Sequence, residues 1–404
     1  MAQPKIRIKG FDGEWEEVLL STIATFSKGR GYSKADICEK GTPIVLYGRM
    51  YTNYSTEIDN VDTYAVLKDN SVISKGNEII IPASGETPED IACASVVKQK
   101  GVIIGGDLNI LSVDGSSYDP SLTALSITYG DAHRELSKSA QGKTVVHLHN
   151  SEISKTKLQY PSSIDEQKQI VSYFKSLDAL IQTTTEKIAS LKQLKSASLI
   201  SMFPQNGEKT PRVRFKGFEG EWKYYSFGKL YRHNVIKNDL TFGTDKVISV
   251  ANMHYTSNTN ISDENYLRTY NIFRIGDIAF EGNKSKDFAH GRFVENTIGD
   301  GIVSHVFEVF TPISDEYDLN YWKYAINNER IMGKILLRCT KASTMMTNLT
   351  ANEFLRENIL VPSYEEQKEI GQFFASLDSQ ISIQEQRLEK LKQIKTACLE
   401  KMFV

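Results

Sequence analysis

The sequence lacks the signatures that mark most catalytic domains. It contains no G-x-x-x-x-G-K-[ST] phosphate-binding loop, no H-E-x-x-H metal motif and no G-x-S-x-G nucleophile motif. An Asn-Pro-Pro-Tyr stretch, which would hold a flipped adenine, is also missing. We therefore expect no catalysis by this chain, and in particular no amino-methyl transfer.

Cysteines and long apolar runs are scarce. Cys38, Cys93, Cys339 and Cys398 lie far apart and form no C-x-x-C pair, so we expect reduced thiols. The start of the sequence has no charged-then-apolar leader, and no apolar run approaches the roughly 20 residues that cross a bilayer. These features predict a soluble, cytoplasmic protein.

The overall charge does not indicate nucleic-acid binding by itself. The 404 residues are 40% hydrophobic and 24% charged, with a formal net charge of −2. This composition is typical of globular domains. Any binding to nucleic acid must therefore use local basic patches or the help of a partner.

The chain carries one long stretch twice. Residues 164–203 align without a gap with residues 364–403, and residues 6–15 (Ile-Arg-Ile-Lys-Gly-Phe-Asp-Gly-Glu-Trp) return as residues 213–222 (Val-Arg-Phe-Lys-Gly-Phe-Glu-Gly-Glu-Trp). The chain is therefore two copies of one plan. A linker rich in Pro and Gly, residues 204–211, separates them and reverses the chain direction.

Both long stretches are predicted to be helices that pair with each other. Apolar residues recur at alternating spacings of four and three, which is the seam of a coiled coil. Pro161 and Pro362 stand just before the helix starts. The seam consists of Ile170, Phe174, Leu177, Ile181, Ile188 and Leu191 in the first copy, and of Ile370, Phe374, Leu377, Ile381, Leu388 and Leu391 in the second.

Each copy has one polar seam position, Thr184 and its counterpart Gln384. Two alternatives are open: either these residues fix the register of the helices, or the helices splay there and the side chains reach water.

The segments before the helices are predicted to be mixed α and β globules. Short β-branched runs bounded by turn residues indicate strands at 42–47, 78–81, 101–104 and 108–113, and again at 245–250, 276–280 and 301–310. The fold class is α+β: two similar α/β domains separated by two long antiparallel coiled-coil helices, with pseudo-two-fold symmetry. The predicted domains are residues 1–160, 161–206 (helix and linker), 207–361 and 362–404.

Two motifs could suggest metal chemistry. His147 and His149 would lie on one face of a strand, which is more often an ordinary histidine pair than a metal site. The Glu-Gln-Lys triplets at 166–168 and 366–368 resemble the last part of a nuclease signature. At a helix start they are better explained as acids favoured by the helix dipole on a solvated face.

Small polar and basic stretches before each helix indicate phosphate contacts. Residues 137–144 and 338–344 combine hydroxyls, lysines and turn composition, as phosphate-binding loops do. Residues 48–51, 283–286 and 290–292 add Arg, Asn and Lys, whose side chains can also pair with base edges. Ordinary surface loops are the alternative, less favoured because the pattern recurs.

The sequence resembles the specificity (S) subunit of type I restriction-modification enzymes. The resemblance rests on a proline followed by Glu-Gln-x-x-Ile at each helix start, on Leu-Lys-Gln-x-Lys near each helix end, and on Gly-Phe-x-Gly-Glu-Trp opening each half. It covers the whole chain.

The resemblance implies a non-catalytic subunit of a bacterial or archaeal restriction system. Two target-recognition domains, residues 1–160 and 207–361, would each read half of a bipartite DNA site. The helices would set the spacing and bind two methyltransferase (M) subunits, and endonuclease (R) subunits would join. No cofactor is expected in this chain; S-adenosylmethionine would lie on the methyltransferase, and ATP and Mg on the endonuclease.

The resemblance, together with the loop composition, gives a set of candidate DNA-binding residues. They are Arg49, Asp107, Gly142, Lys143, Thr144, Asn252, Lys284, Arg292, His305, Lys341, Ser343 and Thr344. Two alternatives remain open for the whole chain: the recognition subunit of another restriction class that cuts near its site, and a coiled-coil scaffold that binds protein.

Overall fold

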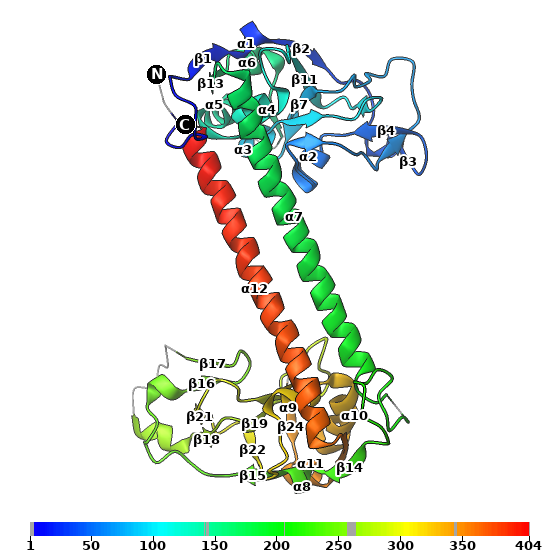
Figure 1. The fold of residues 1–404 in the computed structure, drawn as a ribbon, viewed down its shortest axis with the longest axis vertical. Coiled ribbons are helices and arrows are strands. Elements are labelled where there is room, and N and C mark those ends of the chain that lie inside the picture. The colour runs from blue at the N-terminus through cyan, green and yellow to red at the C-terminus, as the bar shows by residue number, and fades with distance from the viewer. Residues whose placement is uncertain are drawn as a thin grey trace. The chain divides into compact units, whose positions relative to one another are not determined.

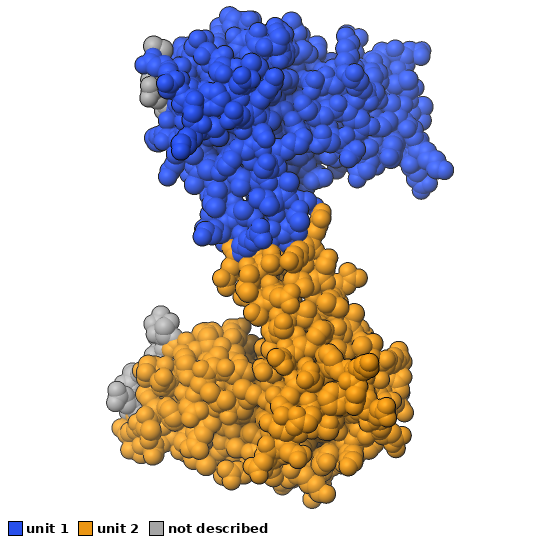
Figure 2. Space-filling view, viewed as in Figure 1, with its two compact units in different colours: residues 1–185, 387–404 blue, residues 186–386 orange. Residues whose placement is uncertain are grey.

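The computed structural model describes residues 4–140, 142, 145–205, 207–256, 264–342 and 346–403. The chain divides into two compact units, which Figure 2 distinguishes by colour. Unit 1 comprises residues 1–185 and 387–404, and unit 2 comprises residues 186–386. Each unit combines one α/β globule with a segment of each repeated helix.

The two repeated stretches are long helices, as the sequence predicts (Figure 1). Helix α7 spans Ile164–Ser201 and helix α12 spans Tyr364–Met402. The hydroxyl oxygens of Ser163 and Ser363 each accept a hydrogen bond from a backbone N–H in the first turn of the helix that follows, at 3.4 Å. These contacts satisfy one of the free donors at each helix start. None of the helices in the described part of the chain is both long and apolar enough to span a membrane.

The globule of unit 1 is built on a five-stranded and a four-stranded sheet. In spatial order the first contains β2 (Ala24–Lys28), β11 (Leu108–Val113), β7 (Glu78–Pro82), β9 (Ser95–Val97) and β5 (Glu57–Ile58). The second contains β10 (Ile103–Ile104), β4 (Thr42–Val45), β6 (Tyr64–Ala65) and β3 (Ile37–Cys38). Two short pairs complete it: β1 (Glu16–Leu19) with β13 (Lys157–Tyr160), and β8 (Ser84–Gly85) with β12 (Val146–His147).

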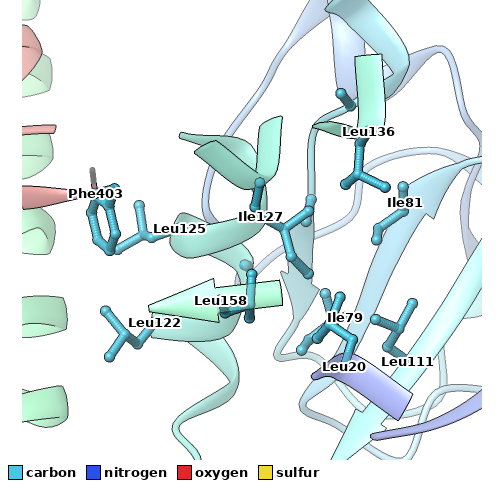
Figure 3. Packing of buried hydrophobic residues seen from close by; sticks show 14 of the residues in the cluster. Leu20, Ile79, Ile81, Leu111, Leu122, Leu125, Ile127, Leu136, Leu158 and Phe403 are labelled. Carbon is cyan, nitrogen blue, oxygen red and sulfur yellow. The ribbon is translucent and has the colours of Figure 1, made fainter. Parts of the chain in front are cut away.

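Helices cover one face of the five-stranded sheet. The helices of this globule are α1 (Leu20–Ile23), α2 (Arg49–Thr52), α3 (Pro88–Ile91), α4 (Pro120–Thr128), α5 (Gly130–Ser139) and α6 (Asn150–Ile153). Figure 3 shows Ile79, Ile81 and Leu111 of the sheet in the same core as Leu122, Leu125 and Ile127 of α4, with Phe403 beside Leu125. The end of the chain therefore contributes to the core of unit 1.

The globule of unit 2 repeats this plan with a four-stranded sheet. Its order is β15 (Tyr231–Asn234), β22 (Glu308–Pro312), β19 (Ile278–Glu281) and β20 (Arg292–Glu295). The paired short strands are β14 (Lys223–Ser226) with β25 (Asn358–Val361), β16 (Ile248–Ser249) with β17 (His254–Tyr255), β18 (Asn271–Phe273) with β21 (Gly301–Val303), and β23 (Thr340–Ala342) with β24 (Thr347–Leu349). The helices are α8 (Phe227–Leu230), α9 (Leu319–Ala325), α10 (Glu329–Cys339) and α11 (Ala351–Arg356).

Two predicted strands differ clearly from the structure. The predicted strand 245–250 begins within a 3-10 helix, Thr244–Lys246, and only Ile248–Ser249 (β16) is a strand. The run 301–310 is two strands, β21 and β22, with a turn at residues 304–307 between them, closed by a hydrogen bond from Phe307 N–H to Ser304 C=O at 3.1 Å. The apolar pattern of the sequence continues through the turn, since the turn contains Val306, which is 63% exposed. Hydrophobicity alone therefore hid the break.

The two long helices pack against each other in antiparallel directions. In unit 1, Tyr173 of α7 contacts Cys398 of α12, and Asp178 further along α7 pairs with the earlier residue Lys395. In unit 2, Lys192 pairs with Glu385 and Lys195 with Asp378. The order of partners is reversed in both units.

The predicted seam residues lie in or beside the two cores. Phe174 and Leu177 belong to the core of unit 1, against which Leu391 packs, and Phe374 and Leu377 belong to the core of unit 2, against which Leu191 packs. Ile188 and Ile381 are buried, and Ile181 and Leu388 are half-buried. Thr184 does not reach water: it is 4% exposed and donates its hydroxyl to Leu180 C=O of its own helix, whereas Gln384 is half-buried.

Candidate nucleic-acid interface

Several loops of unit 1 meet at one edge of its sheet. Strand β7 ends where the antiparallel strand β11 begins, with Pro82 opposite Leu108, and β2 ends beside them. Ala83 N–H donates to Asp107 C=O at 2.8 Å, and Leu148 N–H donates to Ala83 C=O at 3.1 Å. The loop after β7, the turn before β11 and the segment around β12 therefore lie side by side.

Glycines allow the backbone to cross closely at this edge. A Cβ on Gly29 would lie 1.9 Å from Gly105 C=O, so only glycine fits there. The crossing is held by a hydrogen bond from Gly106 N–H to Gly31 C=O at 2.8 Å. It presents Arg30 and the predicted candidate Asp107 in the same exposed region. Arg30 was not predicted, although its Gly-Arg-Gly context was a usable signal.

The guanidinium of Arg49 contacts a neighbouring loop of its own unit. Its guanidinium donates to Asn60 C=O at 3.3 Å and lies 3.8 Å from the carboxylate of Asp62. Its side chain is only 21% exposed. Arg49 therefore supports the loop at residues 60–62, and its predicted contact with DNA stays a prediction.

The corresponding edge of the sheet in unit 2 carries different side chains. Strand β19 leads into loop 282–291, the turn that contains His305 precedes β22, and Asn252 follows β16. Thr347 N–H donates to Gly282 C=O at 2.8 Å, as Leu148 does to Ala83 in unit 1. Asn252, Lys284 and His305 are exposed, and the His305 ring contacts that of Tyr266.

The predicted pre-helix segments adjoin these edges. Gly142 has a φ of +138°, and a Cβ there would lie 2.0 Å from Val145 C=O, next to β12. Lys341 is exposed in β23, opposite Asn348 of β24. Lys143, Thr144, Ser343 and Thr344 lie outside the described residues, so their predicted contacts stay predictions.

The loops that follow the central strands differ in charge between the units. In unit 1 the segment after β7 carries Glu86 and, in the first turn of helix α3, Glu89 and Asp90; Thr87 caps this helix by accepting from Asp90 N–H at 3.1 Å. In unit 2 the loop after β19 carries Lys284 and Lys286 among its exposed residues. The two edges therefore offer different chemistry on one scaffold.

The Glu-Gln pair at each helix start is buried, which corrects the prediction of a solvated face. Glu166 is 0% exposed and accepts Arg7 Nε at 2.6 Å, Arg7 Nη2 at 2.7 Å and Trp15 Nε1 at 3.3 Å. Arg214 makes the same bidentate contact with Glu366 in unit 2, at 2.7 Å for each bond. The hydrogen bond to Glu166 raises the pKa of Arg7. The two motifs that recur in each half therefore bind one another.

Gln167 and Gln367 extend this contact into the globule. Gln167 accepts from Asp119 N–H at 2.8 Å, and Gln367 accepts from Asp318 N–H at 3.4 Å. Asp119 and Asp318 are the N-cap residues of α4 and α9. The start of each long helix is thus tied both to the opening segment and to a helix of its own globule.

The ion pairs between α7 and α12 are built into each unit. Asp178 with Lys395, and Asp378 with Lys195, occupy equivalent positions of the repeat. Asp378 also accepts hydrogen bonds from Tyr324 and Lys323. Burial works to raise the pKa of Asp378, but the hydrogen bonds from Lys195 and Tyr324 lower it overall. These groups therefore hold the helix pair as charged partners.

The rings of His147 and His149 lie parallel with centroids 6.3 Å apart. Within the residues that the structure describes, no group of three or more His, Cys, Asp or Glu side chains is arranged to hold a metal ion.

Comparison with known protein families identifies the class of the chain. The model of the type I restriction modification DNA specificity domain matches residues 12–193 and again residues 220–393. The chain belongs to this family and is a DNA specificity subunit of a type I restriction-modification system, the non-catalytic component of such a system. The family typically binds no cofactor.

Solved structures share the fold. The type I restriction-modification S subunit from M. genitalium is 13% identical, with a TM-score of 0.59 and coverage of 100% of this chain and 99% of that one. The HsdS subunit from Thermoanaerobacter tengcongensis is 14% identical, with a TM-score of 0.51 and 96% of each chain covered. A chain from a study of assembly and conformational transition of the type I R-M system is 12% identical, with a TM-score of 0.51 and coverage of 97% and 98%. No curated protein matched the chain.

Proposed function

We propose that the chain selects a bipartite DNA target, with residues 1–160 reading one half-site and residues 207–361 reading the other. The observation that carries this proposal is the duplicated edge. The same strands in each unit lead into exposed loops at one edge, while the side chains on those loops differ, as Asp107 before β11 and His305 before β22 illustrate. A conserved scaffold with variable loops is suited to two different base sequences.

The DNA contacts at these edges would divide into two kinds. Lys284, Lys341 and the segments around Gly142 and residues 343–344 suit the phosphate backbone, because cations and backbone amides bind phosphate without reading sequence. Asp107, Asn252 and His305 suit base edges, where carboxylates, amides and imidazoles can accept or donate hydrogen bonds. Arg49 and Arg292 would act by holding loops.

The chain would act inside the cell, within a complex that supplies the chemistry. We propose that two methyltransferase subunits dock on the long helices and bring S-adenosylmethionine, and that endonuclease subunits bring ATP and Mg. Exposed apolar residues on the helices support docking: Leu180 and Ile394 in unit 1 are 42% and 38% exposed, and Leu194 and Ile383 in unit 2 are 48% and 57% exposed. Burial of such side chains against a partner would remove apolar surface from water, which favours association.

The test is base-resolution mapping of adenine methylation in cells that express the chain with its methyltransferase partner. The control is the same cells without this chain. A methylated two-part motif that disappears in the control is the expected result. Methylation that is independent of the chain, from a partner shown to be active, would contradict the proposal and favour a scaffold role.

A further inference from the structure

Loop 282–291 of unit 2 is closed by a charged pair at its base. Glu281 ends β19 and Arg292 begins β20, and the two residues are direct partners across the ladder. Arg292 Nε donates to Glu281 Oε2 at 2.7 Å. The side chain of Glu281 is only 9% exposed, so removal of Arg292 would leave its carboxylate without this charged partner in a buried place.

The same guanidinium reaches two further groups. Arg292 Nη2 donates to Ala251 C=O at 3.0 Å, in the turn that carries Asn252. Its Cζ lies 5.3 Å from the ring centroid of Phe288, within the loop itself. One side chain therefore joins the loop to the neighbouring turn and supports the loop from inside.

The other side of the loop base is fixed by β24. Thr347 donates its backbone N–H to Gly282 C=O at 2.8 Å and its hydroxyl to His290 C=O at 3.0 Å. A Cβ on Gly282 would lie 2.1 Å from Thr347 C=O, so this approach requires glycine. At the tip, Phe288 N–H donates to Ser285 Oγ at 3.1 Å and Ser285 N–H donates to Phe288 C=O at 3.0 Å.

A loop held in this way presents its polar residues in a defined geometry. Asn283 to Asp287 are all exposed, whereas Phe288 is half-buried. The side-chain amide of an asparagine can pair with both N6 and N7 of an adenine in the major groove, and a lysine contributes a charge to a phosphate. Recognition of this kind needs the reading group to be held rigidly by its neighbours.

We infer that Asn283 is a base-reading residue for the half-site of unit 2 and that Arg292 is its positioning residue. Asn283 pairs with an adenine edge. Arg292 contacts no base; it fixes the loop and the turn of Asn252 relative to each other. This inference rests on the proposed DNA-reading function and assigns the reading to one loop.

The experiment maps methylated sites in cells that contain the full chain and its methyltransferase partner. The variants are Asn283→Ala, Arg292→Gln and Arg292→Lys. The matched control is Arg212→Lys, because Arg212 forms an ion pair with Glu208 elsewhere in unit 2, with Nε 3.1 Å from Oε1. Asn283 is exposed, so its replacement tests reading without disturbing the core.

In the Asn283→Ala variant, one adenine position of one half-site should lose specificity. The preference for adenine over the other bases at that position should fall by about tenfold. Arg292→Gln should lower the base preference at more than one position of the same half-site, and Arg292→Lys should restore part of that preference. Arg212→Lys should keep the wild-type motif. The other half-site should stay unchanged in all variants. A merely structural role would instead lower methylation at every site without changing base preference.

Full base preference in Asn283→Ala would overturn the reading role. Equal effects of Arg292→Gln on both half-sites, or none on either, would overturn the positioning role. These outcomes are distinct from failure of the proposed function, in which the wild-type chain itself would direct no motif.

Discussion

Glu295 is a carboxylic acid in the core of unit 2. It is 4% exposed, and its Oε1 accepts a hydrogen bond from the Tyr317 hydroxyl at 2.7 Å. The Tyr317 hydroxyl also lies 2.9 Å from that of Tyr231, and the charges of Lys323 and Asp318 act on the site. Burial raises the pKa of Glu295 to about 8, although the hydrogen bond from Tyr317 and the charge of Lys323 work to lower it.

This shift predicts a pH-dependent stability that one substitution removes. The folded chain keeps a proton on Glu295 that the unfolded chain releases near the ordinary pKa of 4.5, so the contribution of Glu295 to stability should fall as pH rises from 4.5 to about 8. Relative to Glu295→Gln, the free energy of unfolding of the wild type should fall by about 1.4 kcal/mol per pH unit in that window. Chemical denaturation at stepped pH measures it.

The matched control for this titration is Glu316→Gln, at an exposed carboxylate of the same unit. A difference between wild type and Glu295→Gln that stays constant from pH 5 to 8 would show that Glu295 does not hold the proton.

At the residue scale, sequence reasoning found polar side chains at the loop edges but not their partners. Arg49 and Arg292 were predicted to bind DNA, and each guanidinium also bonds to a backbone carbonyl from a neighbouring segment of its own unit. An arginine on a loop has the same local sequence signal in either role, because its partners come from distant parts of the chain. Asn283 fell within the predicted segment 283–286, but its place at the base of the loop became clear only when the strand ends were located, and Arg30 was not predicted at all.

At the scale of elements, the buried clamp at each helix start is the most consequential contact. Bidentate bonds join Glu166 to Arg7, and Glu366 to Arg214. The arginine of each repeated opening segment is therefore the partner of the glutamate at each repeated helix start. Heptad spacing predicted both long helices correctly, since the apolar pattern is local and continuous. The burial of the glutamates was not predictable, because an acidic residue at a helix start is normally interpreted as exposed to solvent. Only knowledge of its arginine partner changes that interpretation.

Removal of the charge on Glu166 should destabilise unit 1 strongly. Glu166→Gln keeps the shape of the side chain but leaves Arg7 facing a neutral amide in a buried site, so we expect a loss of about 3 kcal/mol in the free energy of unfolding. The control is Glu221→Gln, in an exposed pair whose oxygen lies 2.8 Å from Lys209 Nζ, with an expected loss of about 0.5 kcal/mol. Chemical denaturation of both variants measures the difference, and equal losses would refute the clamp.

At the scale of the whole molecule, the two copies of the sequence repeat fold into two units whose strands, helix N-caps and ion pairs correspond. Duplication was visible because the helices and the opening segments kept their residues. The loops at the sheet edges were hard to interpret, because their sequences differ between the two copies and so cannot be aligned with each other. Residues 84–90 and 283–290 are an example. Divergence on an unchanged scaffold is itself the property that a subunit for two different half-sites requires.

The most direct test of this account exchanges one half and maps the methylation that results. Residues 207–361 would be replaced by the corresponding residues of another family member with a known target, and the hybrid expressed with the methyltransferase partner of this chain. The account predicts a two-part motif in which one half-site is unchanged and the other is the half-site of the donor. A motif changed in both halves would contradict independent reading by the two halves of the chain.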